Sequence, residues 1–198
     1  LPAPVALTVS FPDPAGPHDQ LERLEGMRVS VASLTVSAPT LGSINEPNAT
    51  ATSQGVFHGV VTGNARPFRE AGIQAPDPAP AGSIPPIPRF DSNPERIRVD
   101  SDGLVGGPLT DVKTGDVVLN LVGPLDYTFR TYSVLPDVGS FSVVDGGRVP
   151  IAVAAPTARE MTIASCNLGR FFDTVNEAGI GEPVLTAGAF NTRRGNAS

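Results

Sequence analysis

The stretch that decides the fold is "GDVVLNLVGPLDYTFRTYSVLP", residues 115–136. It is rich in Val, Leu, Tyr and Phe, and β-branched and aromatic residues favour strands. Gly123-Pro124 interrupts the run, and Arg130-Thr131 is placed to form the turn of a hairpin. The stretch therefore predicts a long, broken strand followed by a shorter strand that returns beside it.

Alternation within this stretch predicts which side chains share a face. We expect two opposed sets in the first part of the long strand, namely Val118, Asn120 and Val122 against Val117, Leu119 and Leu121. After the break, Leu125, Tyr127 and Phe129 continue on one face. The hairpin therefore brings several aromatic side chains to one end of the sheet.

A strand is predicted at "VALTVSF", residues 5–11, and three further strands are predicted between it and the hairpin. Residues 27–39, "MRVSVASLTVSAP", alternate in two segments whose phase slips at Ala32–Leu34, which indicates a bulge in one long, bent strand. "GVFHGVVTG", residues 55–63, and "ERIRVDSDG", residues 95–103, are strand-like. Residues 40–53 are expected to be a polar loop, and a short helix is expected near residues 20–26.

A proline-rich excursion separates the second of these strands from the third. Residues 66–94 hold eight prolines, a density that no regular strand ladder tolerates. We expect an extended surface segment with polyproline character. The order of a bent first strand, a second strand, a third strand after a long loop and a closing hairpin predicts a mostly β fold. It is similar to the small Greek-key barrel of an OB-fold, in which closure removes exposed edges.

Composition narrows the function classes. The formal net charge of −6 argues against tight, non-specific binding to phosphate backbones, since Lys and Arg drive that binding. With Cys166 as the single cysteine, an intramolecular disulfide is impossible. The chain has no run of 18 apolar residues, so we expect no membrane-spanning helix and no membrane partner.

Barrels of this kind bind oligonucleotides or sugars across one strand face. Aromatic side chains would stack on bases or sugars, and arginines would contact phosphates. The binding candidates on the predicted strands are Phe57, Tyr127, Tyr132, Arg96 and Arg98, and Phe129 is a further candidate for stacking. Because the chain has no Trp, the aromatic residues are also the natural filling of the core, and the arginines also suit a solvated strand face. Both interpretations stay open from the sequence.

The chain changes character after residue 150. A linker over residues 151–160 precedes "MTIASCN", residues 161–167, an apolar run that ends in a polar residue. This run resembles the first strand of the endonuclease/exonuclease/phosphatase superfamily, the DNase-I-like fold, in which that strand ends in Asn. Together with the β-domain of residues 1–150, it is similar to the N-terminal part of large secreted bacterial nucleases. Cys166 departs from the pattern, because an aromatic residue usually stands before the Asn.

The resemblance implies a function for a longer parent protein. Asn167 would contact the phosphate or a metal-bound water, and the parent would use Mg²⁺ or a similar divalent metal to hydrolyse phosphodiesters. The family's general base should follow Asn167, yet no histidine does so. We therefore expect residues 161–198 to be the start of an incomplete DNase-I-like domain, with no metal or cofactor bound by this chain. Within this chain alone, Asn167 would simply cap a turn.

Three functions remain in competition at this stage. The first is an accessory domain of a secreted or periplasmic bacterial nuclease, whose main partner is its own catalytic domain and for which nucleic acid is a weak ligand. The second is a stand-alone module that binds oligonucleotide or carbohydrate. The third is a structural interaction domain that only packs against a neighbour, for which the apolar residues near Ile163 and Phe171 would form the contact.

Overall fold

The computed structural model describes residues 1–65, 67–69, 71–74, 89–102, 109–149, 154–159, 161, 163 and 171–197. The chain divides into two compact units. Residues 1–41 and 53–148 form one, here called the β-unit, and residues 42–52 and 149–198 form the other, here called the C-terminal unit. Residues 42–52 of the C-terminal unit are therefore inserted, in sequence, between two parts of the β-unit.

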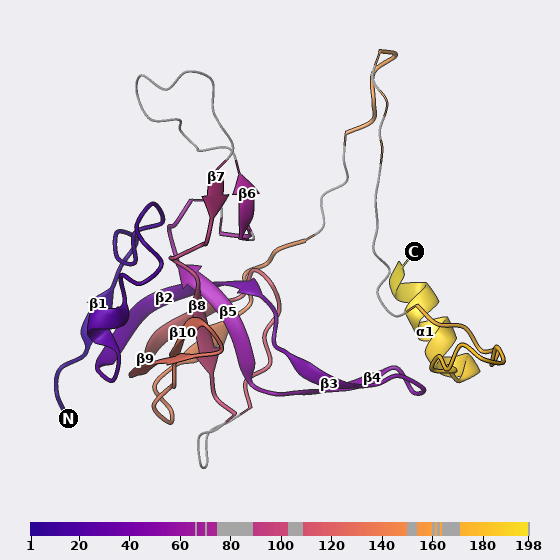
Figure 1. The fold of residues 1–198 in the computed structure, drawn as a ribbon, viewed down its shortest axis with the longest axis horizontal. Coiled ribbons are helices and arrows are strands. Elements are labelled where there is room, and N and C mark those ends of the chain that lie inside the picture. Colours follow the sequence, from indigo (N-terminus) through magenta and orange to yellow (C-terminus); the bar gives the residue numbers. More distant parts are fainter. Residues whose placement is uncertain are drawn as a thin grey trace. The chain divides into compact units, whose positions relative to one another are not determined.

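The β-unit is built on one sheet that closes on itself (Figure 1). The sheet order is β1-β2-β5-β8-β10-β9-β11, and β9 also pairs with β2. Strands β2, β5, β8, β10 and β9 therefore form a closed ring of hydrogen bonds, in which β8 and β10 run parallel. The prediction of a mostly β fold is confirmed. The strands are β1 (Val5–Leu7), β2 (Arg28–Ala38), β5 (Val56–Val61), β8 (Ile97–Asp100), β9 (Val117–Thr128), β10 (Thr131–Val134) and β11 (Ser142–Val144).

The core lies inside the ring and is closed at one end by the N-terminal segment. That segment carries the short 3₁₀ helix η1 (Glu22–Leu24) and adds Leu7, Leu21 and Leu24 to the core. Burying each large apolar side chain stabilises the fold by about 1.5–3 kcal/mol. The ring strands contribute Val29, Val31, Leu34, Val36, Phe57, Ile97, Val99, Val118, Leu121, Leu125, Tyr132 and Val134.

The phase slip predicted for β2 is present, and β9 shares it. Val31 and Leu34 are both buried although three positions separate them, and the same holds for Val118 and Leu121 in β9. Asn120 has φ 59°, a left-handed conformation that lets the strand change the face it presents. The alternation predicted for β9 is therefore wrong beyond Leu119, because it assumed an uninterrupted strand.

A glycine permits close packing of β2 against β5. A Cβ atom added at Gly59 would lie 2.7 Å from the carbonyl oxygen of Thr35. Real Cβ atoms do not approach backbone so closely, so any larger residue would push the two strands apart. This agrees with the close backbone approach that a glycine inside a strand signals.

Two segments predicted to lack strands contain short hairpins. Residues 40–53 are not a plain loop, since β3 (Gly42–Asn45) and β4 (Thr50–Ser53) pair with each other. Within the proline-rich excursion, β6 (Gly72–Gln74) and β7 (Arg89–Asp91) pair as the stem. The prolines between these two strands, residues 76–88, lie outside the described residues.

In its described residues, the C-terminal unit contains the β3–β4 hairpin and the helix α1 (Ala187–Ala197), which the sequence pattern did not indicate. Of the predicted strand 161–167, the structure describes Met161 and Ile163. Neither lies in a strand, and each is 80% exposed, so the expectation of a buried strand is not met at these two positions. Asn167 and Cys166 lie outside the described residues.

Candidate ligand-binding site

The turn between β9 and β10 is unusual in its backbone and its side chains. Phe129 and Arg130 occupy the two central positions with φ of 53° and 64°. Two-residue hairpin turns of this kind favour Asn-Gly, because a side chain crowds the backbone at positive φ. The left-handed conformation costs roughly 1–2 kcal/mol for each such residue. Strain of this size persists where the surrounding structure enforces it, and it is concentrated at functional sites.

The turn presents an aromatic ring to solvent. Phe129 is 85% exposed, which removes almost all of its packing value for the fold. The prediction that the turn falls at Arg130-Thr131 is wrong by one residue, because Thr131 already pairs with Thr128 in the ladder. That single-residue shift moves Phe129 from a strand face to the tip of the hairpin. An exposed ring at a strained tip is the clearest candidate for ligand contact in the β-unit.

The guanidinium of Arg98 lies against the face of the exposed Phe129 ring. Its guanidinium carbon lies 5.1 Å from the centroid of the Phe129 ring, within cation–π range. Arg98 itself is buried, and it is held by Asp100 at 2.6 Å and by a hydrogen bond donated to the Ser133 Oγ at 3.2 Å. These contacts fix the guanidinium, so the ring above it has a preferred position.

Cross-strand register places a row of polar residues on the outer face of the closed sheet of the β-unit. His58 of β5 and Ser133 of β10 are both register partners of Arg98. Directly paired residues point to the same face, opposite to the core residues Phe57 and Val99. Arg98 and Ser133 are buried, at 7% and 0% exposure, so the row fixes the position of Arg98 and presents little polar surface of its own.

Two carboxyl groups lie at the end of this row. The pKa of Asp102 is raised, first by a side-chain hydrogen bond with Asp100, then by burial and by the negative charge of Asp100, while Arg98 opposes the shift. Asp102 also donates its backbone N–H to Asp100. The single guanidinium of Arg98 thus faces more than one carboxyl group, and the row carries little net positive charge.

The remaining predicted candidates lie in different places. Phe57 and Tyr132 are core residues, at 0% and 4% exposure, so they pack inside the closed sheet and offer no face to a ligand. Tyr127 is partly exposed and its ring centroid lies 4.8 Å from that of Tyr132. Arg96 is half-buried and precedes β8. Of the five candidates, Arg98 is the one with a described contact to the Phe129 ring.

The tyrosine pair belongs to the end of the ring that the N-terminal segment closes. The Tyr132 hydroxyl donates to Glu22 Oε2 at 3.0 Å, and its pKa is raised, chiefly by burial and then by that carboxylate. An open cleft of about 610 Å³ lies nearby, lined by Phe11, Asp19, Gln20, Glu22 and Arg23. Arg23 already stacks on Phe11 at 4.6 Å, so part of the lining is satisfied internally.

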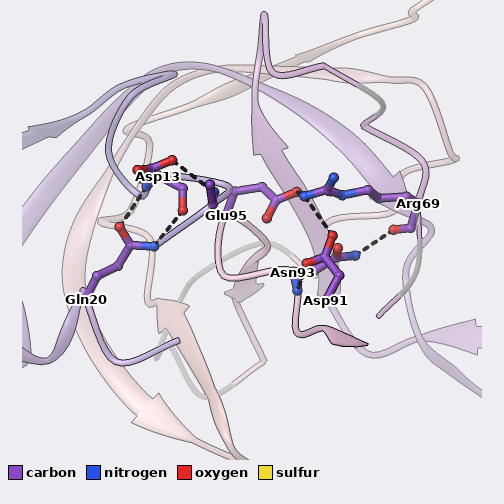
Figure 2. A network of polar contacts seen from close by, with 7 residues as sticks. Asp13, Gln20, Arg69, Asp91, Asn93 and Glu95 are labelled. Atoms are coloured by element: carbon purple, nitrogen blue, oxygen red, sulfur yellow. Dashed lines mark hydrogen bonds and ion pairs between the residues drawn. The ribbon is translucent and has the colours of Figure 1, made fainter. Parts of the chain in front are cut away.

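A second arginine cluster lies at the base of the proline-rich excursion (Figure 2). Arg69 donates to Glu95 Oε1 from Nε at 3.1 Å and from Nη2 at 2.8 Å, and Nη2 lies 3.2 Å from Asp91. Asn93 donates its side-chain amide to the Arg69 carbonyl at 2.8 Å. Glu95 and Asn93 are both buried. The cluster therefore ties the segment before β6 to the segment after β7 and closes the stem.

Among the described residues, no group of three or more His, Cys, Asp or Glu side chains is arranged to hold a metal ion. Asn167, the residue that the nuclease resemblance places at the phosphate, cannot be located, since it lies outside those residues. In the described part of the chain, no helix is both long and apolar enough to cross a bilayer.

Phe129 is one of the aromatic residues on the predicted strands that could stack on a ligand, but its alternation with Leu125 and Tyr127 favours a strand face. The alternation alone does not place Phe129 at the tip of the turn. A signal was nevertheless present. The two tyrosines and the threonines around it, Tyr127-Thr128 and Thr131-Tyr132, are symmetric about Phe129-Arg130. That symmetry places the centre of the turn at Phe129-Arg130.

The comparisons with known proteins identify a family without a described activity. A family model described as a domain of unknown function (DUF8508) matches residues 12–145. Neither the curated proteins nor the solved structures contain a match to the chain. The matched range includes all five strands of the ring together with the Phe129 turn. Since it spans more than half of the 198 residues, the chain belongs to the DUF8508 family.

Proposed function

We propose that the β-unit is an accessory domain of a secreted, metal-dependent nuclease or phosphodiesterase, and that it binds single-stranded nucleic acid at the Phe129 turn. The observation that carries the binding role is the exposed Phe129 ring held over Arg98 at a strained turn. Every base offers a π-face, and stacking a base on an aromatic side chain contributes about 1–3 kcal/mol.

The electrostatics favour weak binding that depends on stacking. The chain has a net charge of −6, and Arg98 is neutralised by Asp100. Arg130, at the turn itself, is the cation best placed to meet a phosphate. Few phosphate contacts mean few released counterions, so we expect affinity to fall only modestly as salt increases.

The nuclease part of the proposal rests on the resemblance around "MTIASCN" and on the β-domain that precedes it. A polypeptide that continues beyond Ser198 would then cleave nucleic acid in the presence of Mg²⁺, and residues 1–198 alone would not. Activity in neither polypeptide would contradict the nuclease assignment while leaving the binding assignment to be judged by the titration below.

The binding role is tested by fluorescence anisotropy with a labelled oligothymidylate. Phe129→Ala removes the ring without disturbing the core, so we expect about 5- to 100-fold weaker binding, the equivalent of one stacked base. Val138→Ala is the matched control, since Val138 is also exposed, at 65%, and lies away from the turn in sequence. Equal affinity of Phe129→Ala and the wild type would overturn the proposal.

A carbohydrate ligand is the second candidate, and the charge balance of the polar row favours it. Arg98, Asp100 and Ser133 are buried and bind one another, so little net charge lies beneath the aromatic platform, which suits an uncharged sugar. Displacement of the labelled oligonucleotide by neutral oligosaccharides would support this candidate. Displacement by unlabelled oligonucleotide alone would exclude it.

A further inference from the structure

The β3–β4 hairpin is poorly suited to standing alone. Its two strands, Gly42–Asn45 and Thr50–Ser53, are almost entirely exposed and pair only with each other. Isolated two-stranded hairpins are at best marginally stable in water. Glu46, at the tip, is nevertheless 8% exposed, which is unusual for a carboxylate. Something must therefore bury the tip and stabilise the hairpin.

The helix α1 is also expected to be only marginally stable on its own. It spans 11 residues, Ala187–Ala197, and isolated helices of that length are marginal in water. It also contains Gly188 and Gly195, which lower helix stability further. Its order must come from contacts along one face, where Ala189 is 4% exposed.

These two marginal elements contact each other. Arg193 Nη2 lies 2.5 Å from Glu46 Oε2, with both side chains mostly buried, although 147 residues separate them in sequence. The backbone N–H of Thr186, immediately before α1, donates to the Pro47 carbonyl at 3.0 Å. One charged contact and one backbone contact thus join the hairpin tip to the start and the middle of the helix.

The rest of the segment folds back around the helix. Leu185 donates its N–H to the Asp173 carbonyl at 2.9 Å and is 3% exposed. The Phe171 and Phe190 rings lie 5.8 Å apart between centroids. Residues 171–197 therefore form a small folded partner for the hairpin tip.

We infer that the β3–β4 hairpin is a docking arm whose occupant is this chain's own segment, residues 171–197, with the Glu46–Arg193 pair as its main lock. Each partner is marginal alone, so docking is what orders both. The inference rests on contacts within the C-terminal unit and is independent of the proposed binding function.

The test is amide hydrogen exchange on the intact chain. Arg193→Glu places two carboxylates together, so we expect exchange of the α1 amides and of the Ala49 amide at the hairpin tip to quicken by about tenfold or more, as loss of a mostly buried ion pair would cause. Arg194→Glu makes the same charge change at an exposed neighbouring position and should leave exchange nearly unchanged. Amides of β2 and β9 should stay protected in both variants, which verifies that the β-unit is folded.

A charge exchange makes the test specific. Glu46→Arg alone should loosen the helix as Arg193→Glu does, and the double variant Glu46→Arg, Arg193→Glu should restore most of the protection. Equal exchange in the Arg193→Glu and Arg194→Glu variants would overturn the inference. So would a double variant that is no better protected than either single one.

Discussion

Two arginine clusters in the β-unit share their chemistry and differ in their setting. Arg69 with Glu95 and Asp91, and Arg98 with Asp100, are both mostly buried guanidinium–carboxylate groups. The first closes the stem of β6 and β7, and its polar groups bind one another. The second supports an exposed aromatic ring at a strained turn. A buried arginine–carboxylate pair alone therefore does not indicate a function. The exposed Phe129 ring beside Arg98 is what distinguishes the second cluster from the first.

The difference has an energetic counterpart. In the Arg69 cluster, every contact ties one part of the chain to another, so its loss should reduce stability. In the Phe129 turn, positive φ at two non-glycine residues reduces stability, and the exposed ring contributes little to it. The account therefore predicts opposite effects of mutation at the two places.

The largest effect on folding is expected at Glu95. Glu95→Gln keeps the size of the side chain and removes the charge, which leaves the Arg69 guanidinium buried with a weaker partner. Because Asp91 still pairs with Arg69, we expect the cost to be that of weakened charge-assisted hydrogen bonds, about 1.5–3 kcal/mol of the free energy of unfolding. Urea unfolding measures the change. Asp145→Asn, which alters the exposed pair with Lys113, is the control and should have little effect.

The comparison is sharpened by binding measurements on the same variant. Folded Glu95→Gln protein should bind oligonucleotide as the wild type does, because the proposed ligand contact lies at the Phe129 turn and not at the Arg69 cluster. A variant that is stable yet binds poorly would show that the two clusters are not functionally distinct.

An intermediate effect of opposite sign is expected at the turn. Phe129→Asn with Arg130→Gly installs the sequence that a turn with two positive φ values favours. Relief of strain should raise the free energy of unfolding by about 1–2 kcal/mol. The same change removes the ring and the cation, so oligonucleotide affinity should fall about tenfold or more. If this double variant were more stable but bound oligonucleotide as tightly as the wild type, the strained turn would have no role in binding.

The smallest effect is expected at Asp102. Its pKa is raised in the folded chain, chiefly by the hydrogen bond with Asp100, so the folded state holds this proton more tightly than the unfolded state. That contribution to stability is present below the ordinary Asp pKa and is lost as the pH rises through the raised value. Because Asp102 is exposed, the change should stay under about 1 kcal/mol.

The measurement is the difference in the free energy of unfolding between wild type and Asp102→Asn as a function of pH. Relative to the variant, the wild type should lose stability as the pH rises from about 4, the ordinary Asp pKa, toward neutral. A difference that grows in favour of the wild type over that range would show that the pKa is lowered instead.

Much of the closed sheet of the β-unit could be predicted from local sequence patterns. Alternation over "MRVSVASLTVSAP" and "ERIRVDSDG" placed β2 and β8, and the inward side chains of β8, Ile97 and Val99, followed from it. Closure of the ring was predictable because a small sheet with a buried face gains by pairing its edges. These features depend on neighbours in sequence and on one general rule.

The parts that escaped prediction depend on single residues or on distant contacts. Asn120 reverses the phase of β9 through one left-handed backbone position, which alternation cannot anticipate. The turn at Phe129-Arg130 breaks the usual preference for Asn-Gly, so propensity pointed one residue away. The β3–β4 hairpin and α1 are each marginal, and their order comes from contacts over 147 residues of sequence separation.

The central claim is that the Phe129 turn is the ligand-contacting surface of the β-unit. The most direct measurement is a titration of the ¹⁵N-labelled chain with unlabelled oligothymidylate, followed by amide chemical shifts in NMR spectra. The account predicts that shifts concentrate at Thr128–Thr131, Arg98 and Ser133, and that the Arg69 and Glu95 amides do not move. Shifts centred on the Arg69 cluster or on the cleft beside Phe11, with the turn unaffected, would contradict it.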